Sequence, residues 1–206
     1  MFAAASGRAV RAQRRSLVID AHCHAGHGQA LSAPWTTRAD PEVTLRRMEE
    51  AGIDRTVIFP INNDQYAKPN QEIAEICRRY PGKFIGFAKH DPHTEAGRIG
   101  ALLEREVKEL GLRGLKLHRL PTREVLDAVV ALRIPVLYHP EKVSQLHLIA
   151  AEYPQVNFIL AHLGSFASRD WTEHLAAIDV ARRYANVYLE PPRWCSHNTW
   201  SWRCES

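Results

Sequence analysis

Short apolar runs alternate with helix-like stretches along most of the chain. Seven of the runs resemble strands, and the first of them is continuously apolar at Leu17, Val18 and Ile19, as in a strand that is buried on both faces. The seven runs cover residues 16–22, 55–60, 83–89, 113–118, 134–139, 156–162 and 186–190. The stretches with helical character are 41–52, 70–80, 95–111, 122–133, 142–153 and 169–184. A strand followed by a helix, repeated with short connections, predicts βαβ units with parallel strands.

Local signals support several of these boundaries. Asp40 followed by Pro41 predicts an N-cap with proline at the first helical position, and Gly52 and Gly111 stand where two helices should end. Within 95–111, apolar residues recur three and four positions apart, which is the stripe that a helix packs against a sheet.

Histidines end four of the predicted strands. They are His22 and His24 on the first strand, His118 on the fourth, His139 on the fifth and His162 on the sixth. In an open doubly wound sheet these carboxyl ends would spread along an edge, whereas in a barrel they converge on one pocket. No glycine-rich phosphate loop follows the first strand. The sequence therefore predicts an α/β fold of the (β/α)8 TIM-barrel type.

Four of the strand ends, "DAHCH", "RGLKLH", "PVLYHP" and "ILAHLG", carry a family resemblance over residues 17–190. The sequence resembles the amidohydrolase superfamily, in particular its amidohydrolase-related (amidohydrolase 2) branch, and is similar to the aminocarboxymuconate-semialdehyde decarboxylase relatives. The resemblance implies a divalent metal, usually zinc, held by His22, His24 and His139. It also implies that His162 lies near the metal as a catalytic or additional metal-binding group.

The residues themselves are suited to that chemistry. Neutral imidazole is a good zinc ligand, and water bound to zinc can lose its proton near neutral pH. Lys116 and His118 are two apart on one strand and so share a face, where we expect them to bind an anionic group of the substrate. The predicted function is a metal-dependent hydrolase of a small carboxylated substrate. A non-oxidative decarboxylase and a catalytically inactive fragment are the alternatives.

Other polar residues have simpler interpretations. His27, His90 and Asp91 fall on predicted loops after the first and third strands. Solvated loop polarity is the expected explanation, and a place at the mouth of the barrel is the alternative. Cys23, between two inward-facing histidines, should point outward into the helix layer.

The composition of the chain limits the kinds of binding partner that we expect. With 206 residues, 45% hydrophobic and 24% charged, the chain fits one globular domain, and no apolar stretch approaches the roughly 18 residues of a membrane helix. The four cysteines show no disulfide spacing, which favours reduced thiols and a cytoplasmic protein. Arg8, Arg11, Arg14 and Arg15 account for the whole net charge of +4. We therefore expect a disordered basic arm at 1–15, a nearly neutral domain at 16–190, a small-molecule substrate and no nucleic-acid or membrane partner.

The resemblance also implies an eighth strand carrying an aspartate in a "GSD" or "GTD" stretch. The sequence has no such stretch after the seventh predicted strand, and Asp170 and Asp179 fall in the predicted helix 169–184. We therefore expect an incomplete barrel of seven strands. The unpaired edges of its first and last strands should recruit other chains, so a homo-oligomer is expected.

The last stretch, 191–206, fits neither a helical stripe nor an alternating strand. Its unusual residues are Trp194, Trp200, Trp202, Cys195, His197 and Cys204. The cysteine and histidine spacing matches no common zinc module. The codons of this stretch admit an amphipathic helix in a shifted frame, so we interpret 191–206 as an aberrant tail that follows a frameshift near codon 190.

Overall fold

The computed structural model of the chain describes residues 16–29, 38–165 and 171–191. The predicted arm at 1–15 and all of the predicted tail except Pro191 lie outside these residues. Within them, no helix is both long and apolar enough to span a bilayer.

The strands match the seven predicted runs. They are β1 (Ile19–His27), β3 (Arg55–Pro60), β4 (Phe84–Gly86), β5 (Ala88–Lys89), β6 (Leu115–Leu117), β7 (Val136–Tyr138), β8 (Phe158–Leu160) and β9 (Val187–Leu189). β4 and β5 are two halves of one predicted strand, and the Phe87 N–H between them donates to Ile58 O on β3 at 2.9 Å. A short extra strand, β2 (Arg38–Ala39), pairs antiparallel with the end of β1.

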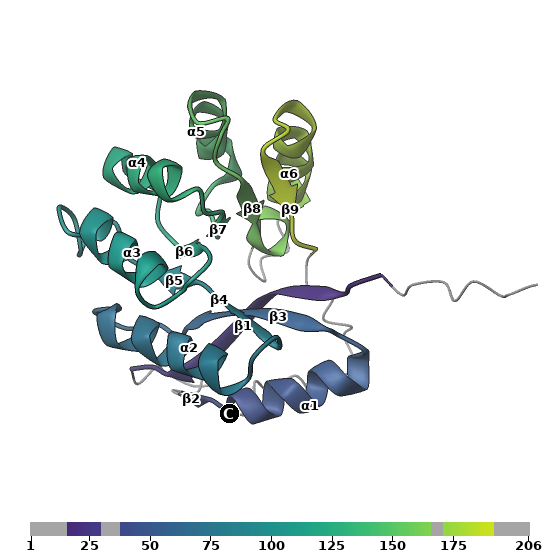
Figure 1. Cartoon of the computed structure of the whole chain (residues 1–206). Helices are drawn as coiled ribbons and strands as arrows, with labels where there is room; N and C mark the ends of the chain where they lie inside the picture. Colours follow the sequence, from purple (N-terminus) through teal and green to yellow (C-terminus); the bar gives the residue numbers. More distant parts are fainter. Residues whose placement is uncertain (1–15, 30–37, 166–170, 192–206) are drawn as a thin grey trace, which may run out of the picture.

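All the other pairings are parallel, in the order β1, β3, β4 with β5, β6, β7, β8, β9. Among the described residues, β9 pairs only with β8, and no strand joins β9 to β1. The sheet curves through most of a barrel without closing (Figure 1). The prediction of an incomplete (β/α)8 barrel with seven strands is confirmed.

The α-helices of the described residues fan around the outside of this sheet (Figure 1). They are α1 (Pro41–Ala51), α2 (Ala67–Arg79), α3 (Ile99–Lys108), α4 (Arg123–Leu132), α5 (Leu146–Glu152) and α6 (Trp171–Arg183). As predicted, Asp40 is the N-cap of α1, Pro41 is its first residue and Gly52 ends it with φ at 68°.

Three helices begin three or more residues from their predicted starts. α5 starts at Leu146 rather than residue 142, and Val143–Gln145 before it form a 3-10 turn. α2 starts at Ala67 rather than residue 70, because Pro69 is tolerated in a first turn, where the missing N–H has no intrahelical acceptor. α3 starts at Ile99 rather than residue 95. Gly97 just before it has φ at 76°, a left-handed conformation that a helix cannot contain.

Alternation along the strands divides the apolar core in two. The larger part lies between sheet and helices and includes Ile58, Leu115 and Leu117. The smaller part has at its centre Val57, Phe59, Phe87, Leu137 and Ala161, which lie on the opposite, inner face of the strands. This inner cluster forms the apolar floor beneath the strand ends. Cys23 packs against the larger core, as predicted.

A buried polar cluster links β5 to α2 and α3. His90 is 2% exposed, so the prediction that it belongs to a solvated loop is wrong. Its Nδ1–H donates to Glu95 Oε2 at 2.9 Å and its Nε2–H donates to Glu106 Oε2 at 2.8 Å. Asn70 donates to Glu106 Oε1 at 2.8 Å and to Lys89 O at 3.1 Å. Burial lowers the pKa of His90, but the bonds to Glu106 and Glu95 outweigh it and raise that pKa to about 9.

The His90 cluster predicts a pH-dependent stability. Because the folded pKa of about 9 lies above the ordinary value of 6.5, this contribution is complete below about pH 6.5 and is lost as the pH rises to about 9. We expect the free energy of unfolding of the parent, relative to His90→Gln, to fall by up to about 3 kcal/mol across that window. Urea unfolding at several pH values measures it.

The comparison with the variant is needed because the lowered pKa of Lys89 acts in the opposite direction in the same pH range. The exposed His93→Gln variant is the control and should follow the parent. Equal pH profiles for the parent and His90→Gln would contradict the ion-pair assignment.

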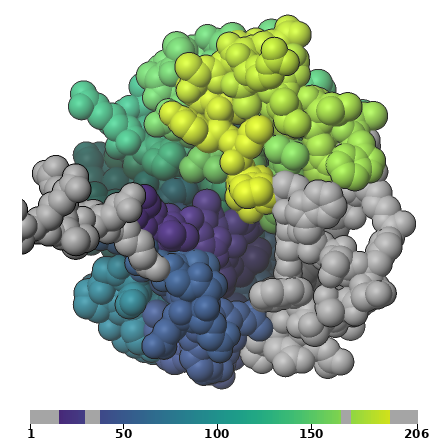
Figure 2. Space-filling model, turned by 90° about the vertical axis from the view of Figure 1, so that its right-hand side faces the viewer, coloured from purple at the N-terminus to yellow at the C-terminus, as the bar shows by residue number. Residues whose placement is uncertain are grey.

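One face of α6 is apolar and open to solvent. Trp171, Leu175 and Ile178 follow one another at helical spacing and are 64%, 66% and 40% exposed. On the same open side, β1 is visible between the end of the described chain and α1 (Figure 2), and Ile19 is 45% exposed. An apolar stripe beside unpaired strand edges is a surface on which chains associate.

We therefore expect the 206-residue chain to self-associate at micromolar concentration, and Leu175→Glu to reduce this association. The substitution should change the free energy of unfolding by less than about 0.5 kcal/mol, because the side chain is exposed. Sedimentation velocity measures the association. Leu148→Glu, at an 80% exposed position on α5, is the matched control. A monomeric parent, or equal association in both variants, would refute the assignment.

Candidate metal centre

Five histidines from four strand ends lie in one row around the mouth of the barrel. Ring centroids are 6.2 Å apart for His24 and His22, 4.4 Å for His22 and His162, 5.2 Å for His162 and His139, and 5.2 Å for His139 and His118. The structure thus brings together all the histidines that the sequence singled out. Their roles as ligands or catalytic groups remain predictions.

Hydrogen bonds fix the orientation of the two β1 histidines. His24 Nδ1 lies 3.1 Å from Pro60 O, and a carbonyl can only accept, so Nδ1 carries the proton. His22 Nδ1 lies 3.0 Å from Glu190 Oε2, and the same tautomer follows when that carboxylate is ionised. In both rings the other nitrogen, Nε2, therefore keeps its lone pair. This is the arrangement in which histidine binds a metal.

His22, His24 and His139 are held in their neutral form. Burial, and then the positive charge of Lys116, lower the pKa of His22 to about 2 and that of His139 to about 3. Burial and Lys89 place the pKa of His24 well below its ordinary value. Phe59 lies beneath His22 and His24, with centroids 4.9 and 4.7 Å away. The apolar floor thus explains why these rings are desolvated and available as neutral ligands.

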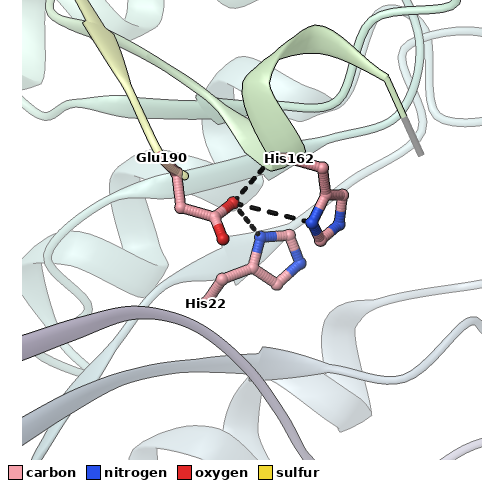
Figure 3. A group of neighbouring side chains, drawn as sticks. All are labelled: His22, His162 and Glu190. Carbon is pink, nitrogen blue, oxygen red and sulfur yellow. Dashed lines mark hydrogen bonds and ion pairs between the residues drawn. The ribbon is translucent and has the colours of Figure 1, made fainter. Parts of the chain in front are cut away.

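Glu190 is the site residue that sequence reasoning missed. Figure 3 shows its carboxylate between His22 and His162. Oε2 accepts the hydrogen bond from His22 and a second from the His162 backbone N–H at 2.9 Å, and lies 3.8 Å from His162 Nδ1. One ligand atom from each of the three residues lies within 4.8 Å of the others. The sequence signal was available, because Glu190 directly follows β9 as the histidines follow their strands.

His162 sits in an unusual backbone conformation. Its φ is 53° and that of Leu163 is 52°, in the left-handed region that L-residues other than glycine seldom adopt. The Glu190 carboxylate accepts from the His162 N–H, and Glu190 O accepts from the Leu163 N–H at 2.8 Å. Glu190 therefore holds both the ring of His22 and the turn that carries His162.

Lys116 lies inside the barrel below the histidines. It is fully buried, and among the described residues its Nζ has no hydrogen-bond partner. The centroid of the Phe59 ring lies 5.4 Å from Nζ. Burial, and then the charge of Lys89, lower the pKa of Lys116 well below its usual value. A buried amine without an acceptor is suited to bind an anionic or carbonyl group of a small molecule.

His118 lies at the far end of the row and lines a cavity of about 340 Å³. The sequence placed Lys116 and His118 on one face of a strand, and both reach the interior of the barrel. His27, by contrast, points away from the row and bonds the Glu72 carboxylate at an exposed position.

The donor set fits a divalent metal. Neutral imidazoles with a free Nε2, held by a carboxylate and a carbonyl, are the usual ligands of zinc and similar ions. We therefore expect Glu190→Gln to lower the affinity for a divalent metal by roughly 10- to 100-fold, since the carboxylate that orients His22 is lost. Titration with zinc against a competing chelator measures it. The control is Glu141→Gln, and equal affinities in the two variants would show that Glu190 has no such role.

Comparison with known proteins identifies the family of the chain. Residues 19–206 match the sequence model of the Amidohydrolase family. A comparison with curated proteins finds no match. Among solved structures, similar folds include 2,6-dihydroxybenzoate decarboxylase from Rhizobium, with TM-score 0.56, 16% identity and coverage of 73% of this chain and 67% of that one.

Two further structures are similar. For 4-oxalomesaconate hydratase from Rhodopseudomonas palustris, the TM-score is 0.57 at 18% identity, over 84% of this chain and 73% of that one. For 5-carboxyvanillate decarboxylase from Novosphingobium aromaticivorans, with bound manganese, the TM-score is 0.58 at 15% identity. The match covers 85% of this chain and 75% of that one. These likenesses establish the shared fold, and the sequence match establishes that the chain belongs to the amidohydrolase family.

Proposed function

We propose that this chain is a metal-dependent enzyme that removes a carboxyl group from a small carboxylated substrate. The observation that carries the proposal is the row of partly buried histidines above a buried lysine. The proposed ligands His22, His24 and His139 are held neutral, and the lysine has no acceptor among the described residues. Metal ligands and an anion-binding amine thus lie within one desolvated site. Decarboxylases with similar folds act on 2,6-dihydroxybenzoate and 5-carboxyvanillate, which supports a carboxylated substrate.

In this proposal His22, His24 and His139 hold the metal. Zinc is the ion first expected for imidazole ligands, and manganese is the ion found in one structure of similar fold. When bound, a divalent ion supplies Lewis-acid polarisation of a substrate oxygen.

The chain's own residues bind the substrate and move the proton. Lys116 and His118 bind its carboxylate, and the Phe59 floor keeps water away from it. Loss of CO2 leaves the electron pair of the broken carbon–carbon bond on the substrate carbon, where a proton must be delivered. His162 lies between His22 and His139 and is the group proposed to donate that proton.

Hydrolysis is the second candidate, supported by the family description as an amidohydrolase. The same ligands and the same proton-transfer group would serve attack by water on a C–N or C–O bond. Product analysis separates the two reactions. Decarboxylation releases ¹³CO2 from a labelled carboxyl group, whereas hydrolysis incorporates ¹⁸O from water.

The metal assignment predicts close to one divalent ion per chain after expression in metal-supplemented medium. We expect the double variant His22→Ala/His24→Ala to lose most of that metal, because two of its three proposed ligands are gone. Elemental analysis of the purified proteins measures it. His27→Ala/His93→Ala removes two exposed histidines and is the matched control. Unchanged metal content in the first variant would refute the proposed ligands.

The activity assay uses the parent with aromatic and aliphatic carboxylates as candidate substrates. We expect release of CO2 that is lost in His162→Ala while the metal content remains. Carboxyl-independent hydrolysis in the same assay would favour the second candidate. Turnover that persists in metal-free protein would contradict both.

A further inference from the structure

The cavity of about 340 Å³ lies beside the row of histidines and joins it at His118. A second link runs through Pro60. Its carbonyl oxygen accepts from His24 Nδ1 at 3.1 Å and from Lys89 Nζ at 3.4 Å. Lys89 lines the cavity and is only 1% exposed. The cavity therefore extends the proposed metal centre toward a buried lysine.

Most charged groups around the cavity are already paired. Arg119 bonds Glu141 at 2.9 Å, and His90 lies between Glu95 and Glu106. Asp91 accepts from the backbone N–H groups of the residues that follow it. No carboxylate of the described residues forms an ion pair with Lys89.

Lys89 has only neutral acceptors. Its Nζ donates to Asn62 Oδ1 and to Pro60 O, and lies 5.4 Å from the centroid of the Tyr66 ring. Since an ammonium has three N–H donors, these two bonds leave one for a further acceptor. A lysine is seldom buried without a counter-charge, because desolvation disfavours its charged form. Burial accordingly lowers the pKa of Lys89 to about 7.

A second buried lysine lies in register with the first. Lys89 on β5 pairs with Lys116 on β6, so both side chains leave the sheet on its inner face. Two amines thus stand side by side, one below the histidines and one at the cavity. An anion bound at Lys89 would supply the counter-charge that the described residues do not provide.

We propose that Lys89 and the cavity bind a second carboxylate of the substrate, at the end remote from the reacting carboxyl group. The substrate class is then a small dicarboxylate. The position of the reacting carboxyl group rests on the proposed function, whereas anion binding at Lys89 requires no metal. A volume of about 340 Å³ lies within the range of small-molecule sites, about 300 to 1,000 Å³.

The test compares dicarboxylates with their mono-amides, which have nearly the same shape and one charge fewer. Isophthalate is paired with 3-carbamoylbenzoate, and adipate with its mono-amide. Binding to the parent is measured by calorimetry at pH 6.5, where an amine of pKa about 7 is mostly protonated. We expect the dicarboxylate of at least one pair to bind 10-fold or more tightly than its mono-amide. Less than a 3-fold preference in both pairs would overturn the proposal, and this arm needs no variant.

The second arm uses Lys89→Met, which keeps the length of the side chain and removes the charge. The preference for the dicarboxylate should fall below 3-fold, while the affinity for the mono-amide stays within 3-fold of the parent. Lys89→Arg should restore part of the preference. Lys83→Met, at an exposed position, is the control. An undiminished preference in a folded Lys89→Met protein would overturn the assignment to Lys89.

The His22→Ala/His24→Ala variant separates this inference from the proposed function. If the dicarboxylate preference depends on Lys89 in that variant, the anion site stands even where the metal assignment fails. If the parent binds metal and releases CO2 but shows no Lys89-dependent preference, the function stands and this inference falls.

Discussion

The period-two alternation of side chains along parallel strands is the constraint on which the site depends. In register across the sheet, Lys89, Lys116, Leu137, Ile159 and Tyr188 form one layer. His118 and His139 follow two residues later on their strands and so stand one layer above it, toward the carboxyl ends. A slip of one residue in any strand would turn its inward side chains into the helix layer. The large core between sheet and helices therefore stabilises the site indirectly, by holding each strand in register.

The open side of the barrel is bridged at one point by side chains. β9 and β1 share no backbone pairing among the described residues, yet Glu190 after β9 accepts a hydrogen bond from His22 on β1. The same carboxylate supports the left-handed turn at His162. Desolvation raises the pKa of Glu190, and its hydrogen bond from the His162 N–H acts against that rise. One carboxylate thus couples the geometry of two histidines from opposite ends of the described chain.

Buried amines give the site its chemical character. Lys89 and Lys116 lie on the inner face of neighbouring strands, and Phe59 and Phe87 supply apolar surroundings there. Metal ligation needs neutral histidines, and the nearby lysines help to keep them neutral by lowering their pKa values. Among the described residues, neither lysine forms an ion pair with a carboxylate. Buried lysines of this kind are suited to a ligand that carries the compensating negative charge.

The sequence alone determined the seven strands, their parallel order and the convergence of five histidines. Each depends on periodicity and on which residues end the apolar runs, and both are local properties. The two-residue spacing of Lys116 and His118 on one strand also determined that their side chains share a face. The starts of α2 and α3 were less certain, because Pro69 and Gly97 act through backbone detail.

Only the tertiary structure decided what each polar group contacts. Glu190 meets His22 across 168 positions of the chain, and no local pattern reports such a pairing. The sequence suggested a loop position for His90. In the structure its ring is buried and hydrogen-bonded to Glu95 in the loop that follows and to Glu106 on α3. Lys89 is distinguished only by the absence of a carboxylate partner among the described residues. Burial, tautomer and charge pairing are set by neighbours distant in sequence, so they follow from packing rather than from periodicity.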